Sequence, residues 1–539
     1  MAYPKLSELK ATKGLSRKDL SIKTSIYITG GFLDKAFCDV LDHYLKTVKI
    51  FPEIIFDHWK PTWRSIYSPK HFENIKAAEV IVIPLSMYEL TDGIKDFSRV
   101  VDSIKKLIFN LNEFNSKTIF FLIDKRLSLG LTIPKVEYKG YKDYLKILNE
   151  IELKIDNQNK FLIPISSLSL KCETNAYSDW ISYGFPCSLN EQALTAKIIA
   201  STLASKFGLG KKLLAIDFDE TLSPGILGEK ENLKNISLDL AKPLDRFFFN
   251  FQIYIKSLKK LGFTLVLLSK NNPEAIDFIF NGDSDFIKKS DFAGICLSWE
   301  PKHYSLKKVC DQLNINPKDA IFMDNSTFEV NEMALAFPGI STICLGEDPS
   351  QFLEICNENI WMCSLYEDEN SDSRLKSYKA NQNSGETKSN LTNTKKILSI
   401  PIQISLDHIK EKDITRVIQL INKTNQFNLS GNKFSTSDLE KIDLKIVSRM
   451  RDEFTDYGLT SVILGNINND SLDIIQWVIS CRTFNRNYEF KILNGIVEDF
   501  IPKNISKINL IYKKTDRNGY LINFMQSEDF KSIKNTFRK

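Results

Sequence analysis

The chain has 539 residues, which predicts about three domains at roughly 150 residues each. Its 43% apolar and 26% charged residues are typical of a globular protein, and its apolar runs are shorter than the roughly 20 residues of a membrane span, so we expect no membrane insertion. The net charge of +5 comes from 72 basic and 67 acidic residues, without a basic stripe interleaved with aromatics, which argues against nucleic acid as a partner.

The N-terminal part, residues 1–200, alternates strand-like and helix-like segments. Strands are expected at 25–29, 79–85 and 118–123, and an amphipathic helix at 33–45. This alternation predicts an α/β domain with a parallel sheet. The chain begins without a hydrophobic segment or cleavage signature, so a cytoplasmic location is expected. A serine hydrolase built on such a domain would need its nucleophile directly after the first strand. Thr29 and two glycines stand there instead, so we expect this domain to be non-catalytic.

A second domain is expected over residues 201–363, after an Ala-rich helical run that ends in a glycine-containing turn near 208–210. Its β/α rhythm predicts strands at 213–216, 263–268 and 320–323, with helices opening at 272–273 and running over 304–313. These elements again predict a parallel sheet.

The polar stretch 364–395 contains too little aliphatic surface for a core and is predicted to be a linker. The last domain, residues 396–539, begins with a strand at 398–404, and a helix follows with apolar spacing over 414–421. Nine cysteines are scattered without a C-x-x-C pair, so neither a zinc cluster nor a disulfide framework is expected.

The segment after the strand 213–216 contains the pattern D-x-D-x-T. Asp217 is placed to attack phosphorus and to bind Mg²⁺, Asp219 to handle the proton of the leaving group, and Thr221 to bind substrate. Because the pattern is short, each aspartate could instead cap a helix or a turn.

Three further motifs follow in the order that a phosphotransferase of the haloacid dehalogenase (HAD) type requires. Ser269 closes a strand and precedes Lys270 and Asn271, all expected to bind the phosphorylated substrate. Lys302 supplies a cation for the phosphate and for Asp217. Asp324 ends the strand 320–323 and is expected to complete a Mg²⁺ site with Asp217 and Asp219. The order and spacing favour this function over four unrelated structural roles.

The region between Asp217 and Ser269 is about fifty residues long and largely helical, which leaves no room for a large cap domain. Only a small flap is expected, over residues 225–235. An open mouth of this kind suits a substrate that is carried on a protein.

At this point the chain resembles the FkbH-like proteins, HAD-superfamily members of subfamily IIIC with N-terminal SGNH-like and C-terminal GNAT-like domains. The resemblance rests on the motifs beginning at Asp217, Ser269, Trp299 and Phe322, on 225–229, and, in the last domain, on 423–429, 457–459 and 480–482. Residues 63–69 extend it to the front domain.

The resemblance implies a fold and a function. The fold is an SGNH-like or flavodoxin-like α/β domain, a HAD-like Rossmannoid sheet and an α+β GNAT-like domain. The implied activity is glyceryl transfer and phosphate removal, with a phosphorylated donor such as 1,3-bisphosphoglycerate and an acyl carrier protein or CoA-type thiol as acceptor. Asp217 would be the nucleophile, Asp219 the acid/base, Ser269 and Lys302 the phosphate binders, and Asp217, Asp219 and Asp324 the Mg²⁺ ligands.

The chain departs from the family pattern at several positions. Asn325 replaces a second aspartate, Phe218 and Leu227 stand where several members have a cysteine, and residues 485–487 lack the family's glycines. A glyceryl thioester on the enzyme is therefore not supported, and the donor could differ. Two other hypotheses stay open: a GNAT-type acyltransferase with a vestigial phosphatase domain, and a non-catalytic scaffold that binds a carrier protein.

Overall fold

The computed structural model describes most of the three expected regions. The described residues are 3–29, 31, 33–57, 69–86, 117–124, 146, 149, 159–165, 187–225, 238–275, 287–368, 371–372, 374–376, 378, 402–451, 456–480, 483, 488–502, 505–515, 518–527 and 530. They form two compact units, the first with residues 1–204 and 363–366, the second with 205–362 and 367–539. Within these ranges, no helix has both the length and the apolar character needed to cross a bilayer.

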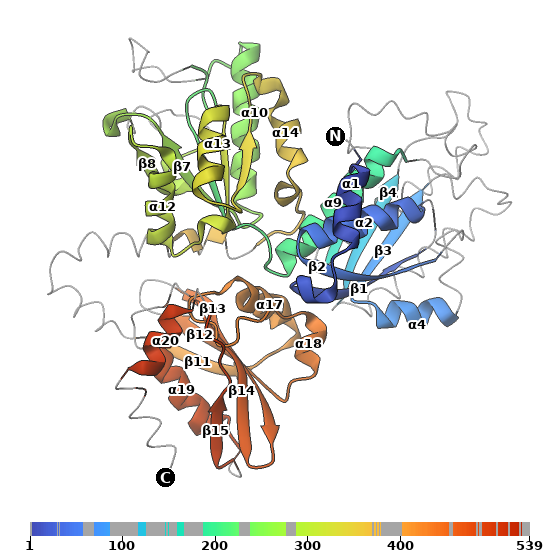
Figure 1. Ribbon diagram of the computed structural model, residues 1–539, viewed down its shortest axis with the longest axis vertical. Coiled ribbons are helices and arrows are strands. Elements are labelled where there is room, and N and C mark those ends of the chain that lie inside the picture. Colours follow the sequence, from blue (N-terminus) through green and yellow to red (C-terminus); the bar gives the residue numbers. More distant parts are fainter. Residues whose placement is uncertain are drawn as a thin grey trace. The chain divides into compact units, whose positions relative to one another are not determined.

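The first unit is built on a five-stranded parallel sheet in the order β2-β1-β3-β4-β5 (Figure 1). The strands are β1 (Ile22–Ile28), β2 (Ile50–Phe56), β3 (Val80–Ser86), β4 (Thr118–Asp124) and β5 (Lys160–Pro164), and the helices include α1 (Leu6–Lys13), α2 (Lys35–Thr47), α4 (Pro69–Ala77) and α9 (Leu189–Lys206). The predicted parallel α/β sheet is confirmed. Strands β2 and β5 were not predicted.

The second unit contains a parallel sheet in the order β10-β9-β6-β7-β8. Its strands are β6 (Leu213–Ile216), β7 (Thr264–Ser269), β8 (Phe292–Leu297), β9 (Ala320–Asp324) and β10 (Ser341–Cys344), and its helices are α10 (Pro243–Leu258), α12 (Lys302–Leu313), α13 (Thr327–Ala336) and α14 (Phe352–Glu358). The three predicted strands are present. The helix expected to open at 272–273 begins as a 3₁₀ turn, Pro273–Ala275, and its continuation lies outside the described residues.

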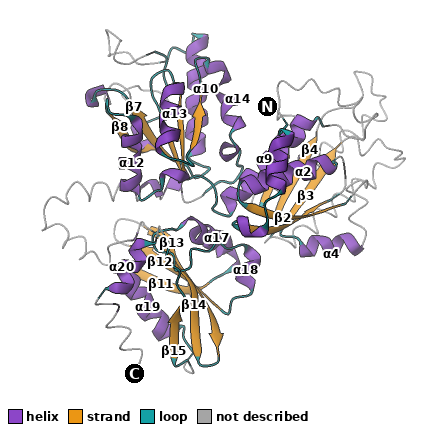
Figure 2. Ribbon diagram, in the orientation of Figure 1, coloured by secondary structure: helices purple, strands orange, loops and turns teal. Residues whose placement is uncertain are grey.

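Helices cover both faces of this sheet because its strands are apolar on both sides (Figure 2). Successive residues of a strand point to opposite faces, so Leu214 and Ile216 pack with α10 and α14. Leu213 and Ala215 pack with α12 and α13. Burial on both faces explains why the four residues of β6 are all apolar and fully buried.

The second unit also contains a mixed sheet in the order β11-β12-β13-β14-β15. The strands are β11 (Gln403–His408), β12 (Leu444–Arg451), β13 (Asp456–Asn468), β14 (Ser471–Ile479) and β15 (Lys507–Leu510), and the helices are α17 (Ile414–Lys423), α18 (Thr436–Glu440), α19 (Tyr488–Asp499) and α20 (Gly519–Gln526). Neighbouring strands are antiparallel except for the parallel pair β14 and β15. The predicted helix over 414–421 is present as α17.

One outer edge of β14 is closed by a segment from far away in the sequence. The N–H groups of Leu429 and Ile479 donate to the carbonyls of Trp477 and Phe427, at 3.0 and 3.2 Å. β13 already pairs with β14 at these residues on the other side. Both edges of β14 are therefore hydrogen-bonded there, although β15 pairs only with its first four residues.

The two sheets of the second unit are joined by hydrogen bonds at the start of β6. The Lys212 ammonium donates to the carbonyl of Lys423 at 2.8 Å and to Asp319 at 3.0 Å. The Asn422 amide donates to the carbonyl of Phe207 at 2.6 Å. The C-terminal end of α17 is thereby tied to the amino edge of the parallel sheet.

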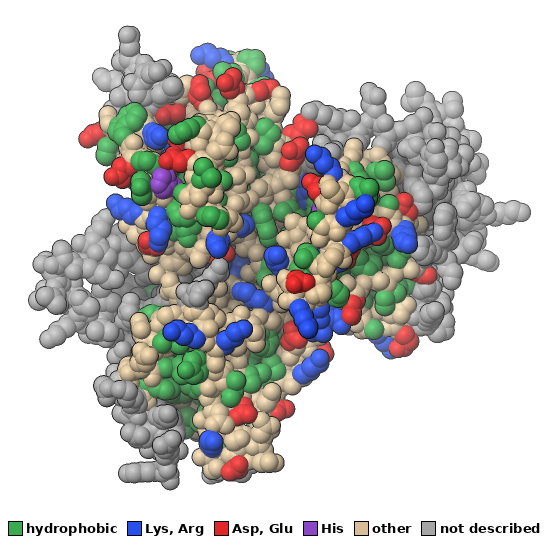
Figure 3. Space-filling model, viewed as in Figure 1, with side chains coloured by type: hydrophobic (Ala, Val, Ile, Leu, Met, Phe, Trp, Pro, Cys, Tyr) green, Lys and Arg blue, Asp and Glu red, His purple; other side chains and the backbone are tan. Residues whose placement is uncertain are grey.

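Part of the predicted linker packs into the second unit. Asp368 is 3% exposed and accepts hydrogen bonds from Arg374, while Tyr378 belongs to the core beside α12 and α13. Residues 379–400, the flap beyond Gly225 and the front motif at 63–68 lie outside the described residues. Over the face drawn in Figure 3, basic, acidic and hydrophobic side chains are interspersed, consistent with the small net charge.

Candidate active site

The carboxyl ends of three neighbouring strands bring the predicted site residues together. β6 lies between β7 and β9, with Ile216 in register with Leu267 and Met323. Asp217 follows β6 directly, and its N–H donates to the carbonyl of Met323 at 3.1 Å. Because parallel strands end at the same edge, Asp217 lies beside the last residues of β7 and β9, which are Ser269 and Asp324.

Lys302 bridges the two carboxylates at this edge. Its Nζ lies 2.7 Å from Oδ1 of Asp217 and 2.6 Å from Oδ2 of Asp324. All three residues are at most 5% exposed. Lys302 is the first residue of α12, after Pro301, so the start of that helix sets its position.

The burial of these charges shifts their pKa values. Burial raises the pKa of Asp217 to about 7, opposed by the Lys302 ammonium and reinforced by Asp324. Burial likewise raises the pKa of Asp324, although Lys302 opposes the shift. Burial alone would lower the pKa of Lys302, but the two carboxylates outweigh it and the pKa is raised. With all three groups charged, two carboxylates and one ammonium leave one negative charge in a buried site.

That remaining charge fits a hard cation. Asp217 and Asp324 supply carboxylate oxygens of the kind that Mg²⁺ prefers, and backbone carbonyls and water are suitable further ligands. Among the described residues, no group of three His, Cys, Asp or Glu side chains is arranged to hold a metal by itself. A cation bound here would therefore need oxygen ligands besides Asp217 and Asp324, such as a backbone carbonyl, water or a substrate oxygen.

Asn271 connects Asp219 to Ser269. Its amide donates to Oδ2 of Asp219 and to Oγ of Ser269, both at 2.8 Å. Ser269 and Asn271 are 2% and 3% exposed. Since the Ser269 hydroxyl oxygen accepts this bond, its own hydrogen is directed elsewhere and suits a phosphoryl oxygen.

The Asp217 loop is held in a tight turn. The carbonyl of Phe218 accepts hydrogen bonds from the N–H groups of Thr221, Leu222 and Ser223. The Gln252 side chain of α10 donates to the carbonyl of Leu222 at 2.7 Å. Sequence reasoning did not identify Gln252, because nothing in a helical pattern shows which distant loop a side chain will reach.

Two predicted substrate-binding residues lie in other surroundings. Thr221 is fully buried, and its hydroxyl lies 3.5 Å from Oδ2 of Asp217, so it supports the aspartate. Lys270 forms an ion pair with Glu329 of α13 at 2.5 Å. The structure thus brings Asp217, Lys302 and Asp324 into one hydrogen-bonded group and Asp219, Asn271 and Ser269 into a second group, both after the ends of strands of the same sheet. Thr221 lies beside Asp217.

Glu329 is a residue that sequence reasoning missed. It is 8% exposed, and its Oε2 is buried and has no hydrogen-bond partner among the described residues. Its charge contributes to the raised pKa of Asp324. The only signal in the sequence was its place in the first turn of the helix that follows Asp324.

Neither a scan of protein-family models nor a search of curated proteins finds a match to this chain. Among solved structures, the N-terminal part of the protein BF1531 from Bacteroides fragilis, containing a phosphatase domain and complexed with Mg, is 20% identical. The alignment covers 67% of this chain and 98% of that chain, with a TM-score of 0.58. The HAD family enzyme bt-2542 from Bacteroides thetaiotaomicron, a magnesium complex, is 18% identical over 25% of this chain and 93% of that chain, with a TM-score of 0.18 that is too low to indicate a shared fold. Over the part aligned with BF1531, this chain has the fold of that Mg-complexed phosphatase-domain structure.

Proposed function

We propose that this chain is a Mg²⁺-dependent phosphohydrolase of the HAD type that acts on a phosphorylated small molecule. The observation that carries the proposal is the buried set of Asp217, Lys302 and Asp324 at the carboxyl edge of the parallel sheet. The similarity in fold to the BF1531 structure, which contains a phosphatase domain and is complexed with Mg, supports it.

The geometry suggests how the reaction proceeds. Lys302 holds Oδ1 of Asp217, while Oδ2 lies 3.5 Å from the Thr221 hydroxyl and is the freer oxygen for attack on phosphorus. As the new P–O bond forms, the bond to the leaving oxygen breaks, and Asp219 donates a proton to that oxygen. Asp219 then accepts a proton from water, which attacks phosphorus and releases Asp217.

The remaining residues position the phosphoryl group. Ser269 donates to a phosphoryl oxygen, and Asn271 keeps Asp219 at the same edge. Asp217, Asp324 and the Asp219 carbonyl would hold Mg²⁺, which supplies charge stabilisation during phosphoryl transfer. Lys302 offsets negative charge that develops on Asp217 and on the phosphoryl oxygens.

For the donor, we propose an acyl phosphate of the 1,3-bisphosphoglycerate type, with transfer of the glyceryl unit to a carrier-protein or CoA-type thiol. This proposal rests on the resemblance of the motifs to FkbH-like proteins. The alternative, a GNAT-type acyltransferase with a vestigial phosphatase domain, is supported by the mixed sheet with its parallel β14 and β15. It is weakened by the pairing of 427–429 with β14, which occupies backbone groups that an extended thiol-bearing arm would need.

Phosphate release tests the proposed function. We expect the protein to release phosphate faster from 1,3-bisphosphoglycerate generated in situ than from 3-phosphoglycerate. Phosphate release should stop when EDTA removes Mg²⁺. Excess Mg²⁺ should restore the rate. Mass spectrometry of an added acceptor thiol then separates hydrolysis from transfer. A rate that is unchanged by EDTA contradicts the metal-dependent mechanism.

Substitution of Asn271 tests its positioning role. Asn271→Ala removes the donor to Asp219, so we expect the kcat of phosphate release to fall about tenfold, a part of the roughly 10²–10⁴-fold that a positioned general acid contributes. The loss of these two hydrogen bonds should also lower the free energy of unfolding by about 1–3 kcal/mol, so the rates are compared below the unfolding temperature of both variants. Asn272→Ala is the matched control, because Asn272 is exposed and its side chain accepts a hydrogen bond from Trp299, away from Asp219. Equal kcat values for the two variants would exclude the role assigned to Asn271.

A further inference from the structure

A cavity lies at the edge of the parallel sheet opposite to the catalytic site, within the second unit. It has a volume of about 90 Å³. Lys212 precedes β6, Thr264 opens β7, and Ile315 lies between α12 and β9, so the parallel sheet contributes its amino edge. The catalytic residues Asp217, Ser269 and Asp324 are at the carboxyl ends of the same strands. The cavity is therefore separate from the catalytic site.

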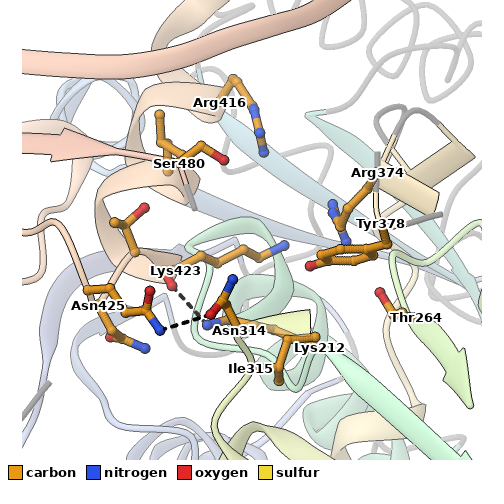
Figure 4. A pocket seen from close by; sticks show the side chains of 13 residues that line it. Lys212, Thr264, Asn314, Ile315, Arg374, Tyr378, Arg416, Lys423, Asn425 and Ser480 are labelled. Carbon is orange, nitrogen blue, oxygen red and sulfur yellow. Dashed lines mark hydrogen bonds between the residues drawn. The ribbon is translucent and has the colours of Figure 1, made fainter. Parts of the chain in front are cut away.

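Four basic side chains line this cavity. Figure 4 shows Arg374, Arg416 and Lys423 converging on one region, with Tyr378 beside Arg374 and Lys212 near Asn314. The side chains of Lys212, Arg374 and Lys423 are 19%, 13% and 21% exposed. These cations are thus held in partly desolvated surroundings, unlike lysines and arginines on an open surface.

Two carboxylates lie beside the basic side chains of the cavity. Lys212 pairs with Asp319 at 3.0 Å, and Asp368 accepts from Arg374 and lies 3.5 Å from Lys423. Among the described residues, Asp319 and Asp368 thus stand beside the four basic side chains. Burial, together with the neighbouring cations, lowers the pKa of Lys423 to about 8 despite Asp368. Burial alone would raise the pKa of Asp368, but Arg374, Lys423 and Arg416 hold it well below its usual range.

Neutral hydrogen-bonding groups complete the lining. The hydroxyls of Thr264, Tyr378 and Ser480 and the amides of Asn314 and Gln426 border the cavity. A hole that admits one water needs on the order of 10–15 Å³, so this cavity has room for a group of several heavy atoms. Guanidinium groups bind the oxygens of phosphates and carboxylates well because they donate several hydrogen bonds in a fixed geometry.

We propose that this cavity binds the phosphate group of a small molecule, as a dianion, at a site distinct from the catalytic centre. Four basic side chains around one cavity favour a dianion such as a phosphate monoester or inorganic phosphate. Since α17 and the parallel sheet both contribute cations, a bound phosphate would bridge the two sheets of the second unit. The site would respond to the phosphorylated substrate or to the released product, and its existence does not depend on the proposed catalytic function.

Calorimetric titration of the full chain with inorganic phosphate in EDTA tests this site. Without a cation, the catalytic edge lacks the metal charge that would help to hold a phosphoryl group, so binding under these conditions reports mainly on the cavity. We expect one site per chain, with about tenfold weaker binding in Arg416→Gln, because one charge-assisted hydrogen bond is removed, and with no binding in the Arg416→Gln, Lys423→Gln double variant. Lys412→Gln is the matched control, because Lys412 is exposed just before α17.

Two further measurements distinguish phosphate binding in the cavity from two alternatives. In the first alternative phosphate binds at the catalytic edge, and in the second the cations only stabilise the packing of the two sheets. Ser269→Ala should bind phosphate in EDTA as the wild type does, and equal loss in Ser269→Ala and Arg416→Gln would place the phosphate at the catalytic edge and overturn the proposal. If the cations only brace the two sheets, Arg416→Gln lowers the unfolding temperature and leaves phosphate binding unchanged, which also overturns it.

The ligand source follows from a comparison of three anions. Tighter binding of 3-phosphoglycerate than of phosphate supports a phosphate ester as the ligand, and the reverse order supports released phosphate. Glycerate carries the carboxylate without the phosphate and should bind at least tenfold more weakly than either. Glycerate binding as tight as that of phosphate, or no phosphate binding at all, contradicts the proposal.

Discussion

Asp217→Asn is expected to reduce phosphate release on the order of 10⁴-fold or to the background rate, because an amide cannot form the phosphoryl–enzyme bond. The side chain keeps its shape, so Lys302 and Thr221 still have a polar partner. Initial rates with Mg²⁺ and a phosphorylated donor measure the effect. Asp311→Asn is the control, since Asp311 is an exposed carboxylate on the same helix as Lys302.

Retained turnover in Asp217→Asn would refute the nucleophile assignment. If thiol acylation then continued at the wild-type rate, the acyltransferase hypothesis would replace it. A wild type that releases no phosphate from any tested donor, while folded and loaded with Mg²⁺, would favour the carrier-binding scaffold.

The same variant gives a stability test with a defined pH dependence. The pKa of Asp217 is raised to about 7 in the metal-free fold, from 3.8, mainly by burial. Between these pH values the folded state retains a proton that the unfolded state has lost, so wild-type stability falls as pH rises from about 4 to 7. Asn does not titrate, so Asp217→Asn should gain stability relative to wild type over this window, by roughly 4 kcal/mol at most. Urea unfolding in EDTA at about pH 4 and pH 7 measures the difference in unfolding free energy between the variant and the wild type. The same difference at both pH values would contradict the raised pKa of Asp217.

Lys302→Met is expected to be the most destabilising single change at the site. The ammonium is the shared partner of Asp217 and Asp324, and its removal leaves two buried carboxylates facing each other. Breaking a buried ion pair from one side costs about 3–5 kcal/mol. Phosphate release should be lost as well, because the charge that offsets the phosphoryl oxygens is gone. Urea unfolding at pH 8 and initial rates measure the two effects.

Two comparisons show whether the loss of stability in Lys302→Met comes from the two carboxylates that are left without the ammonium. Lys307→Met removes an exposed lysine one turn further along α12, where an ion pair with Asp311 contributes about 0–1 kcal/mol. Adding Asp324→Asn to Lys302→Met removes one of the two carboxylates and should recover stability. If the double variant is no more stable than Lys302→Met, the destabilisation arises from lost packing of the lysine stem.

Much of the site followed from the sequence because its main residues stand next to strand ends. Asp217, Ser269 and Asp324 each follow or close an apolar run, and strands of one parallel sheet end at a common edge. That rule turns spacing along the chain into proximity in space. Lys302 could be added because its motif follows those of Asp217 and Ser269 in the expected order and spacing, and the structure places it at the start of α12.

Other parts could not be predicted because they depend on long-range contacts. The pairing of Lys270 with Glu329 depends on where α13 lies, and the reach of Gln252 to Leu222 depends on α10. Strand β2 lies at the edge of its sheet and is only partly buried. A proline and a glutamate interrupt its apolar residues, so the sequence pattern for a strand is weak. The cavity lined by Lys212, Arg374 and Lys423 joins residues that are far apart along the chain.

The hydrogen bonds of Lys212 and Asn422 also affect how the second unit unfolds. Each joins a group beside the parallel sheet to one near the end of α17. If one sheet unfolds alone, the hydrogen-bonding groups of the other sheet lose their partners. A buried donor or carbonyl without a partner raises the free energy of such a partly unfolded state. The unfolding free energies of the two sheets are therefore not additive, and the unit gains cooperativity from contacts that lie outside both hydrophobic cores.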